Sequence, residues 1–201
     1  MEEALSLESL INRVNSKYEK DEQRVVGIML ARYDLKVTRT LVNECYQYWH
    51  KNTGNGFDIF WVGYGAYLPE TEESDTKIIM DFRGNVDHAY YDLDAFISAK
   101  RELTRVLDYS YNDCMQLVLV NYYNGKLHFK ESFQIDLEQN LDENMTSIRK
   151  IVEWLTEECC REGNVEKVLH KLRKKGIIEK IKGVSISEVF DKGLGVAGLM
   201  I

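Results

Sequence analysis

Residues 25–31 read Val25-Val26-Gly27-Ile28-Met29-Leu30-Ala31, an almost uninterrupted apolar run of strand length. Strands that are buried on both faces carry such continuous runs, whereas strands with one wet face alternate apolar and polar residues. We therefore expect this segment to be the central strand of a sheet, with helices covering both of its faces.

A helix and a second strand follow this run. Asp34 stands where a helix cap would, and apolar residues then recur at helical spacing until the Gly-rich turn at 52–56. The next run, from Phe57 to Tyr64, is aromatic and rich in β-formers. Strand, helix and strand together predict a βαβ unit, in which the two strands are parallel.

Further elements are expected on either side of this unit. The patterns predict an amphipathic helix over 4–22 with Ser6 as N-cap, a short strand over 77–82, a helix capped by Asp92 and running to about Leu107, and a strand over 114–120. Asn124-Gly125 is the pair that type I′ hairpins need for two positive φ angles, so a hairpin is expected at 122–129. A helix up to Gly163 follows it.

This order of elements resembles the thioredoxin-like fold over roughly residues 24–160. The fold class expected is α/β, with a mixed central sheet and flanking helices in a domain over 1–163. Residues 164–201 are expected to form a helical C-terminal extension, with Asn164 as a helix cap, Gly176 as the stop of that helix, a short turn near 187–192, and an apolar tail over 193–201. Such a tail either docks on its own domain or meets a partner.

The sequence departs from the redox branch of that fold. No cysteine pair begins the first crossover helix, where the chain reads Ala31-Arg32-Tyr33-Asp34-Leu35-Lys36. The cis-proline of the family has no counterpart before the hairpin, where Cys114 and Met115 stand. Disulfide exchange needs a reactive thiolate and a resolving thiol, so thiol oxidoreductase activity is not expected.

Short stretches at 26–32, 57–65 and 117–121 are also similar to a group of uncharacterised bacterial proteins. That resemblance implies a bacterial or phage source and supplies no activity. The start of the chain is acidic and lacks the basic, apolar pattern of an export signal, no stretch approaches the roughly 20 apolar residues of a membrane span, and the four cysteines have no regular spacing. We expect a cytoplasmic protein with free thiols and no membrane contact.

Charge is distributed unevenly along the chain. The net charge is −7, which argues against general nucleic-acid binding. Residues 165–182 nevertheless carry seven basic side chains against two acidic ones. This segment is either a solvated helix face or a contact for an acidic partner. The residues expected to make interactions are Lys171, Arg173, Lys174 and Lys175 of this segment and Leu194, Val196, Leu199, Met200 and Ile201 of the tail.

Candidate chemistry is sparse. Asp81, Arg83, Asp87 and His88 follow a predicted strand and are the weak candidates for a catalytic loop, since open α/β sheets bind ligands at strand ends. Cys159 and Cys160 are adjacent on a predicted helix and point about 100° apart, so they are interpreted as packing residues. No metal site and no cofactor is expected.

Two main functions therefore stay open, and a third possibility, nucleic-acid contact by the helix at 165–182, predicts binding that weakens steeply with salt. The first is a non-enzymatic interaction or accessory module that binds a protein partner or forms a homo-oligomer through its basic segment, its tail and the tyrosines near its strand ends. The tyrosines meant are Tyr64, Tyr67, Tyr90, Tyr91, Tyr109, Tyr111, Tyr122 and Tyr123. The alternative is an enzyme with a polar active site in the loop from Asp81 to His88.

Overall fold

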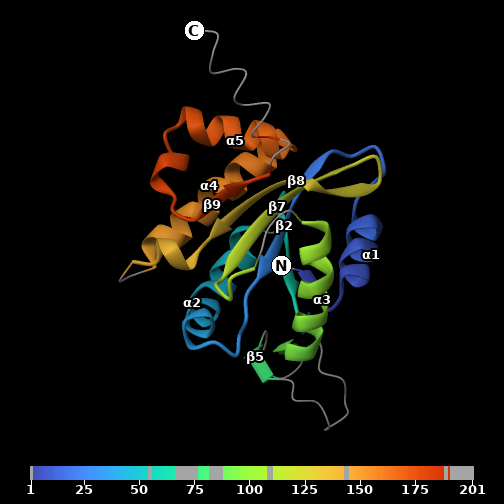
Figure 1. Ribbon diagram of the computed structural model, residues 1–201, viewed down its shortest axis with the longest axis vertical. Coiled ribbons are helices and arrows are strands. Elements are labelled where there is room, and N and C mark those ends of the chain that lie inside the picture. Colours follow the sequence, from blue (N-terminus) through green and yellow to red (C-terminus); the bar gives the residue numbers. More distant parts are fainter. Residues whose placement is uncertain are drawn as a thin grey trace.

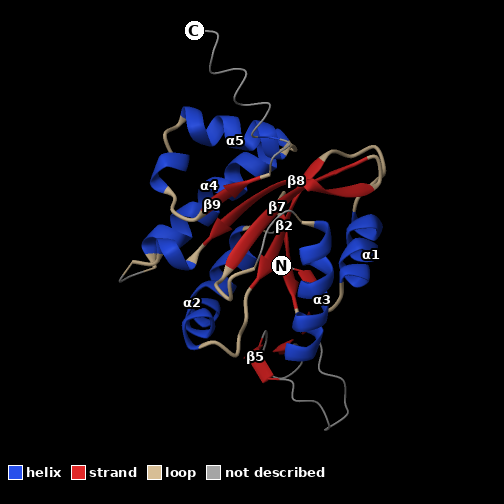
Figure 2. Ribbon diagram, in the orientation of Figure 1, coloured by secondary structure: helices blue, strands red, loops and turns tan. Residues whose placement is uncertain are grey.

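The computed structural model describes residues 2–53, 56–66, 77–81, 88–107, 111–142, 145–187 and 190. Within these residues the protein is a mixed α/β structure built on a six-stranded sheet with the order β1-β3-β2-β7-β8-β9 (Figures 1 and 2). The strands are β1 (Glu2–Ala4), β2 (Arg24–Leu30), β3 (Asp58–Val62), β7 (Gln116–Tyr123), β8 (Lys126–Asp136) and β9 (Val184–Ile186).

Strand β2 lies in the middle of this sheet, as the apolar run predicts. It pairs in parallel with β3 and antiparallel with β7. On one side β1 extends the sheet parallel to β3, and on the other β8 and β9 follow in antiparallel pairing. The residues of β2 from Val25 to Leu30 are buried, which confirms that both faces of the central strand are covered.

The helices form two layers around the sheet. Helices α1 (Leu7–Lys17) and α3 (Leu93–Val106) contact each other on one face, and α2 (Lys36–Asn52) and α4 (Thr146–Glu162) contact each other on the other (Figure 1). Helix α5 (Val165–Lys174) packs against α4 and against β7 and β8. The predicted βαβ unit is therefore β2-α2-β3, with parallel strands.

Three of the four predicted helix caps are confirmed. Ser6 accepts a hydrogen bond from the amide of Ser9 in a reciprocal capping box, Asp92 caps α3, and Asn164 caps α5. The fourth is wrong, because Leu35 occupies the N-cap position of α2 and makes no side-chain cap. Asp34 is instead bound to the guanidinium of Arg32, which competes for the carboxylate that would have capped the helix.

The hairpin is also confirmed. Asn124 and Gly125 have φ angles of 52° and 69°, and they connect β7 to β8. The register between strands β7 and β8 shifts between Val120 and Asn121. Beyond this irregularity the buried Asn121 side chain accepts a hydrogen bond from the amide of Val165 at 2.8 Å and donates one to Glu131 at 2.9 Å. The start of α5 is thereby bound to the sheet.

A second, three-stranded sheet was not predicted. It consists of β4 (Tyr64–Ala66), β6 (His88–Tyr91) and β5 (Lys77–Asp81) in the order β4-β6-β5. It continues from β3 through Gly63, whose φ is 77°, and the carbonyl of Gly63 accepts a hydrogen bond from Asp92, the cap of α3. The short sheet is thus attached where β3 ends and α3 begins.

The segment expected as a helical extension shares the core of the residues before it. Its elements are α5, the single-turn helix η2 (Ile178–Lys180) and the edge strand β9. Val165, Leu169 and Phe190 belong to the same hydrophobic cluster as the central strand. The expectation of a wholly helical segment is therefore corrected, because β9 pairs with β8. The apolar tail at 193–201 and most of the predicted turn at 187–192 lie outside the described residues.

No helix in the described part of the chain is long and apolar enough to cross a membrane.

Candidate functional site

The carboxyl end of β2 and the start of α2 form a polar cluster. Arg32 forms ion pairs with Asp34 at 2.6 Å and with Asp113 at 3.1 Å, and the hydroxyl of Tyr91 donates to Asp34 at 3.4 Å. The hydrogen bonds from Arg32 lower the pKa of the Asp34 carboxyl below its ordinary value. The position at which the thioredoxin-like resemblance would place a reactive cysteine pair therefore holds one arginine paired with two carboxylates.

A third carboxylate, that of Glu138, lies at this end of the sheet. Glu138, in the single-turn helix η1 (Glu138–Asn140), accepts hydrogen bonds from the Thr38 hydroxyl at 2.7 Å and from the Met115 amide at 2.9 Å. These bonds tie α2 to the start of β7. Both bonds end on the same oxygen of Glu138, Oε1, so this carboxylate joins the two elements.

The four cysteine thiols share one property, a raised pKa. Burial and the nearby carboxylates of Asp136 and Glu138 raise the pKa of Cys114 to about 11. Burial also raises the pKa of Cys45, Cys159 and Cys160. A raised pKa lowers the thiolate fraction at neutral pH, and the thiolate is the reactive form. No group of three or more metal-ligating side chains occurs among the described residues.

This electrostatic setting makes Cys114 a slow nucleophile. We expect Cys114 to react with iodoacetamide about tenfold more slowly at neutral pH than an ordinary cysteine, because the loss of thiolate outweighs the gain in intrinsic nucleophilicity. The rate should rise as the pH approaches 11, the pKa of this thiol. Peptide mass mapping of the Cys160→Ser variant, which lacks the exposed Cys160, measures it. A rate that is flat above pH 9 would contradict the expectation.

The predicted catalytic residues are only partly described. Asp81 ends β5 and His88 begins β6, and the two residues face each other in the antiparallel register. Arg83 and Asp87 lie outside the described residues. Asp81 lies in the strand that the sequence predicts over 77–82, whereas His88 belongs to a strand over 88–91 that was not expected.

The predicted interaction residues divide into three groups. Lys171 lies 3.6 Å from Glu162, and Lys175 forms an ion pair with the buried Glu158, so both of these lysines are engaged within the chain. Arg173 is half-buried and Lys174 is exposed. Leu194, Val196, Leu199, Met200 and Ile201 lie outside the described residues.

Of the eight tyrosines expected at an interaction surface, four belong to the core instead, while Tyr67 and Tyr109 lie outside the described residues. Tyr64, Tyr90, Tyr91 and Tyr122 are all buried, with exposed fractions of 8% or less. Tyr64, Tyr91 and Phe96 form a chain of ring contacts at centroid distances of 5.0 and 6.0 Å. These rings pack the junction of the two sheets, so they are not available to a partner.

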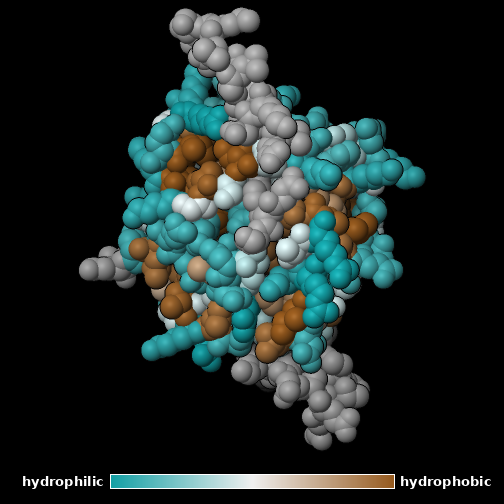
Figure 3. Space-filling model, viewed as in Figure 1, coloured by the Kyte–Doolittle hydropathy of each residue, from teal (hydrophilic) through white to brown (hydrophobic). Residues whose placement is uncertain are grey.

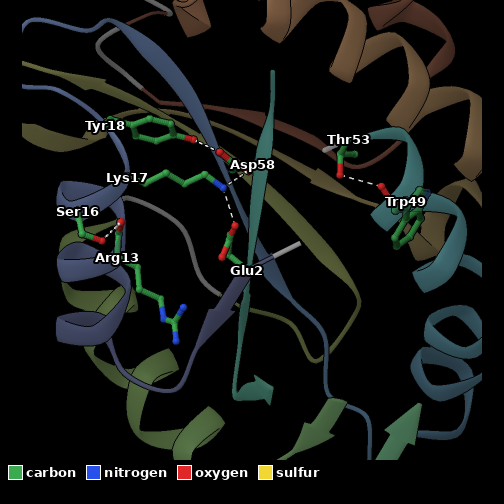
Figure 4. A network of polar contacts seen from close by, with 8 residues as sticks. All are labelled: Glu2, Arg13, Ser16, Lys17, Tyr18, Trp49, Thr53 and Asp58. Carbon is green, nitrogen blue, oxygen red and sulfur yellow. Dashed lines mark hydrogen bonds and ion pairs between the residues drawn. The ribbon is translucent and has the colours of Figure 1, made fainter. Parts of the chain in front are cut away.

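One polar network was missed entirely. Lys17, at the end of α1, forms ion pairs with Glu2 of β1 at 2.5 Å and with Asp58 of β3 at 2.8 Å, and the Tyr18 hydroxyl donates to Asp58 (Figure 4). Burial and the hydrogen bond to Asp58 raise the pKa of Tyr18. The network fixes α1 to the edge of the sheet. Nothing local in the sequence links residues 2, 17 and 58.

Two open cavities lie beside α4. One, of about 330 Å³, is lined by Tyr48, Trp49, Val152, Glu153, Thr156 and Glu157, between α2 and α4. The other, of about 420 Å³, is lined by Gln139, Asn140, Leu141, Asp142, Ser147, Lys150, Ile151, Trp154, Lys180 and Lys182. We refer to the second as the α4 groove. Its size falls in the range of ligand-binding clefts.

Comparison with known proteins gives no relative for this chain: no protein-family model matches it, and neither does any curated protein or solved structure.

Proposed function

We propose that this chain is a non-enzymatic interaction module with a thioredoxin-like core, which assembles with itself or with another protein. The strand order β3-β2-β7-β8 supports the thioredoxin-like part of the proposal, because β2 and β3 are parallel and β7 runs antiparallel to both of its neighbours, β2 and β8. Helices that connect these strands on alternate faces support it as well.

The absence of accessible chemistry at the described strand ends favours a non-enzymatic role. Where β2 ends, Arg32 and Asp34 neutralise each other, and the nearby Cys114 has a raised pKa. Sites that catalyse reactions usually hold groups whose pKa is tuned toward neutrality. We also infer a cytoplasmic location, since Cys45, Cys114, Cys159 and Cys160 are free thiols.

The observation that carries the proposal is an exposed basic surface on an acidic chain. Lys167, Lys174, Lys180 and Lys182 are exposed, and none of them forms an ion pair with a residue that the structure describes. The whole chain has a net charge of −7. Such charge asymmetry steers association with acidic surfaces. Figure 3 shows that hydrophobic side chains gather below α5 on the face in view.

The proposed assembly through the C-terminal tail can be measured directly. We expect removal of residues 193–201 to lower the mass found by light scattering to that of a single chain, because the tail is apolar and rich in glycine. The full chain should give a higher mass that rises with protein concentration. A truncated chain that keeps both its mass and its partners would remove the tail from the proposal.

His88→Ala is the matched control for this experiment. The pairing of Asp81 with His88 across β5 and β6 is the one observation that favours the alternative, an enzyme with these residues in its active site. Under the interaction proposal, His88→Ala leaves the mass unchanged. A substrate turned over by the full chain and not by His88→Ala would favour the enzyme.

A further inference from the structure

The α4 groove is bounded by three segments that are far apart in the sequence. One wall consists of residues 139–142, which form the end of η1 and the loop after it. The opposite wall is the first half of α4, with Ser147, Lys150 and Trp154. Lys180 and Lys182, from η2 and the turn before β9, complete it.

The walls of this groove are held in place by Asn140. Its side-chain amide donates to the carbonyl of Asp136 at 2.8 Å and to the carbonyl of Lys182 at 2.9 Å, and its oxygen accepts from the amide of Lys182 at 2.8 Å. Asn140 is 9% exposed. These bonds fix the segment with Lys180 and Lys182 against η1, so the groove exists before any partner binds.

Positive charge dominates the lining. Lys150, Lys180 and Lys182 are exposed, and none of them has an ion-pair partner within the described part of the chain. Among the described residues that line the groove the one carboxylate is Asp142, which accepts hydrogen bonds from the amide and the hydroxyl of Ser147 at the start of α4. Asp142 therefore faces the helix N-terminus, which already stabilises its charge.

The groove also offers apolar surface. Trp154 is half-buried, Ile151 is 3% exposed, and Leu141 is 44% exposed although it is a large hydrophobic residue. Inorganic phosphate makes no use of an aromatic ring or of an exposed leucine. A peptide side chain does, because burying it removes apolar area from water.

We propose that the α4 groove binds an acidic peptide segment of a partner protein, in which carboxylates flank one hydrophobic side chain. The hydrophobic side chain packs between Trp154 and Leu141, and the carboxylates bind Lys150, Lys180 and Lys182. This inference rests on the proposed interaction function and names the chemistry of the partner. Three lysines arranged around an apolar floor match that chemistry better than a nucleic-acid backbone, which needs a longer basic track.

Fluorescence anisotropy with a labelled peptide, Ac-Gly-Glu-Glu-Leu-Glu-Glu-Gly-NH₂, tests the proposal on the full chain. We expect saturable binding that weakens with added salt, and no binding of the matched peptide in which glutamine replaces each glutamate. The variant Lys180→Glu/Lys182→Glu should bind about tenfold more weakly, since two attractive charges become repulsive.

The matched control is Lys126→Glu/Lys130→Glu, which makes the same change of charge at two exposed positions of β8 outside the groove. It should bind the peptide as the native chain does. Circular dichroism checks that both variants fold. An equal loss in the two variants, or equal binding of the glutamine peptide, overturns the proposal.

Competition identifies the kind of ligand. Displacement of the peptide by an equal concentration of inorganic phosphate would indicate a small-anion site, and tighter binding of a single-stranded oligonucleotide would indicate a nucleic-acid surface. Either result overturns the peptide assignment, as does the absence of saturable binding. Repeating the peptide titration with the chain that lacks residues 193–201 separates the two proposals. Peptide binding by this shortened chain supports the groove whether or not the mass changes. An unchanged mass in light scattering refutes assembly through the tail and says nothing against the groove.

Discussion

Gly63→Ala is expected to lower the free energy of unfolding by about 3 kcal/mol, because it combines backbone strain with a steric clash. The φ of Gly63 is 77°, a conformation that disfavours residues with a Cβ. A Cβ there would lie 2.5 Å from the Cβ of Phe96 and 2.9 Å from its Cα, so α3 would have to move away from the end of β3. Urea unfolding followed by circular dichroism measures the loss.

Gly176→Ala is the control that separates strain from clash. Its φ is 63°, close to that of Gly63, but no atom lies within 4 Å of a Cβ at that position. This substitution should cost only the strain, about 1 kcal/mol. Equal losses in the two variants would show that the packing of Phe96 against Gly63 contributes nothing.

Lys175→Met is expected to cost about 2 kcal/mol, because it leaves a buried carboxylate without its partner. Glu158 of α4 is 2% exposed, and Lys175 at the end of α5 forms an ion pair with it. When one member of a buried ion pair is removed, the other charge stays buried with no partner to offset its desolvation energy. The partial exposure of the lysine, 43%, keeps the expected loss below that of a fully enclosed pair. Urea unfolding again gives the value.

Two further variants test this explanation. Lys171→Met removes a lysine one turn earlier, whose partner Glu162 lies 3.6 Å away and is 21% exposed, and it should cost less than about 1 kcal/mol. Glu158→Gln combined with Lys175→Met removes the buried charge itself and should recover most of the loss. A double variant as unstable as Lys175→Met alone would contradict a role for the charge.

The elements that the sequence predicted well are those whose signals are local. The apolar run of β2, the cap Asp92 and the pair Asn124-Gly125 each specify a structure within a few residues. Strands β1 and β9 were missed because each has three residues and depends on its neighbour in the sheet. The prediction of Asp34 as a helix cap was wrong because a cap and an ion pair use the same carboxylate, and in the structure that carboxylate binds Arg32.

The candidate site could be predicted only in part, since the fold regroups the charges. The sequence treats residues 165–182 as one basic segment. In the structure Lys171 and Lys175 bind acidic residues of α4, while Lys180 and Lys182 join Lys150 in the groove. Pairings between elements so far apart along the chain have no signature in spacing or composition.

The hydrogen bond between Asn121 and the amide of Val165 connects the core sheet to the segment that carries two lysines of the proposed binding groove. In a chain shortened to stop at Gly163, the buried Asn121 side chain would lose one of its two hydrogen bonds and keep only the one to Glu131. Strand β8 would lose its pairing with β9. The groove would lose Lys180 and Lys182. The segment that we propose to meet a partner therefore also covers the core, so a substitution in it can affect both stability and the proposed binding.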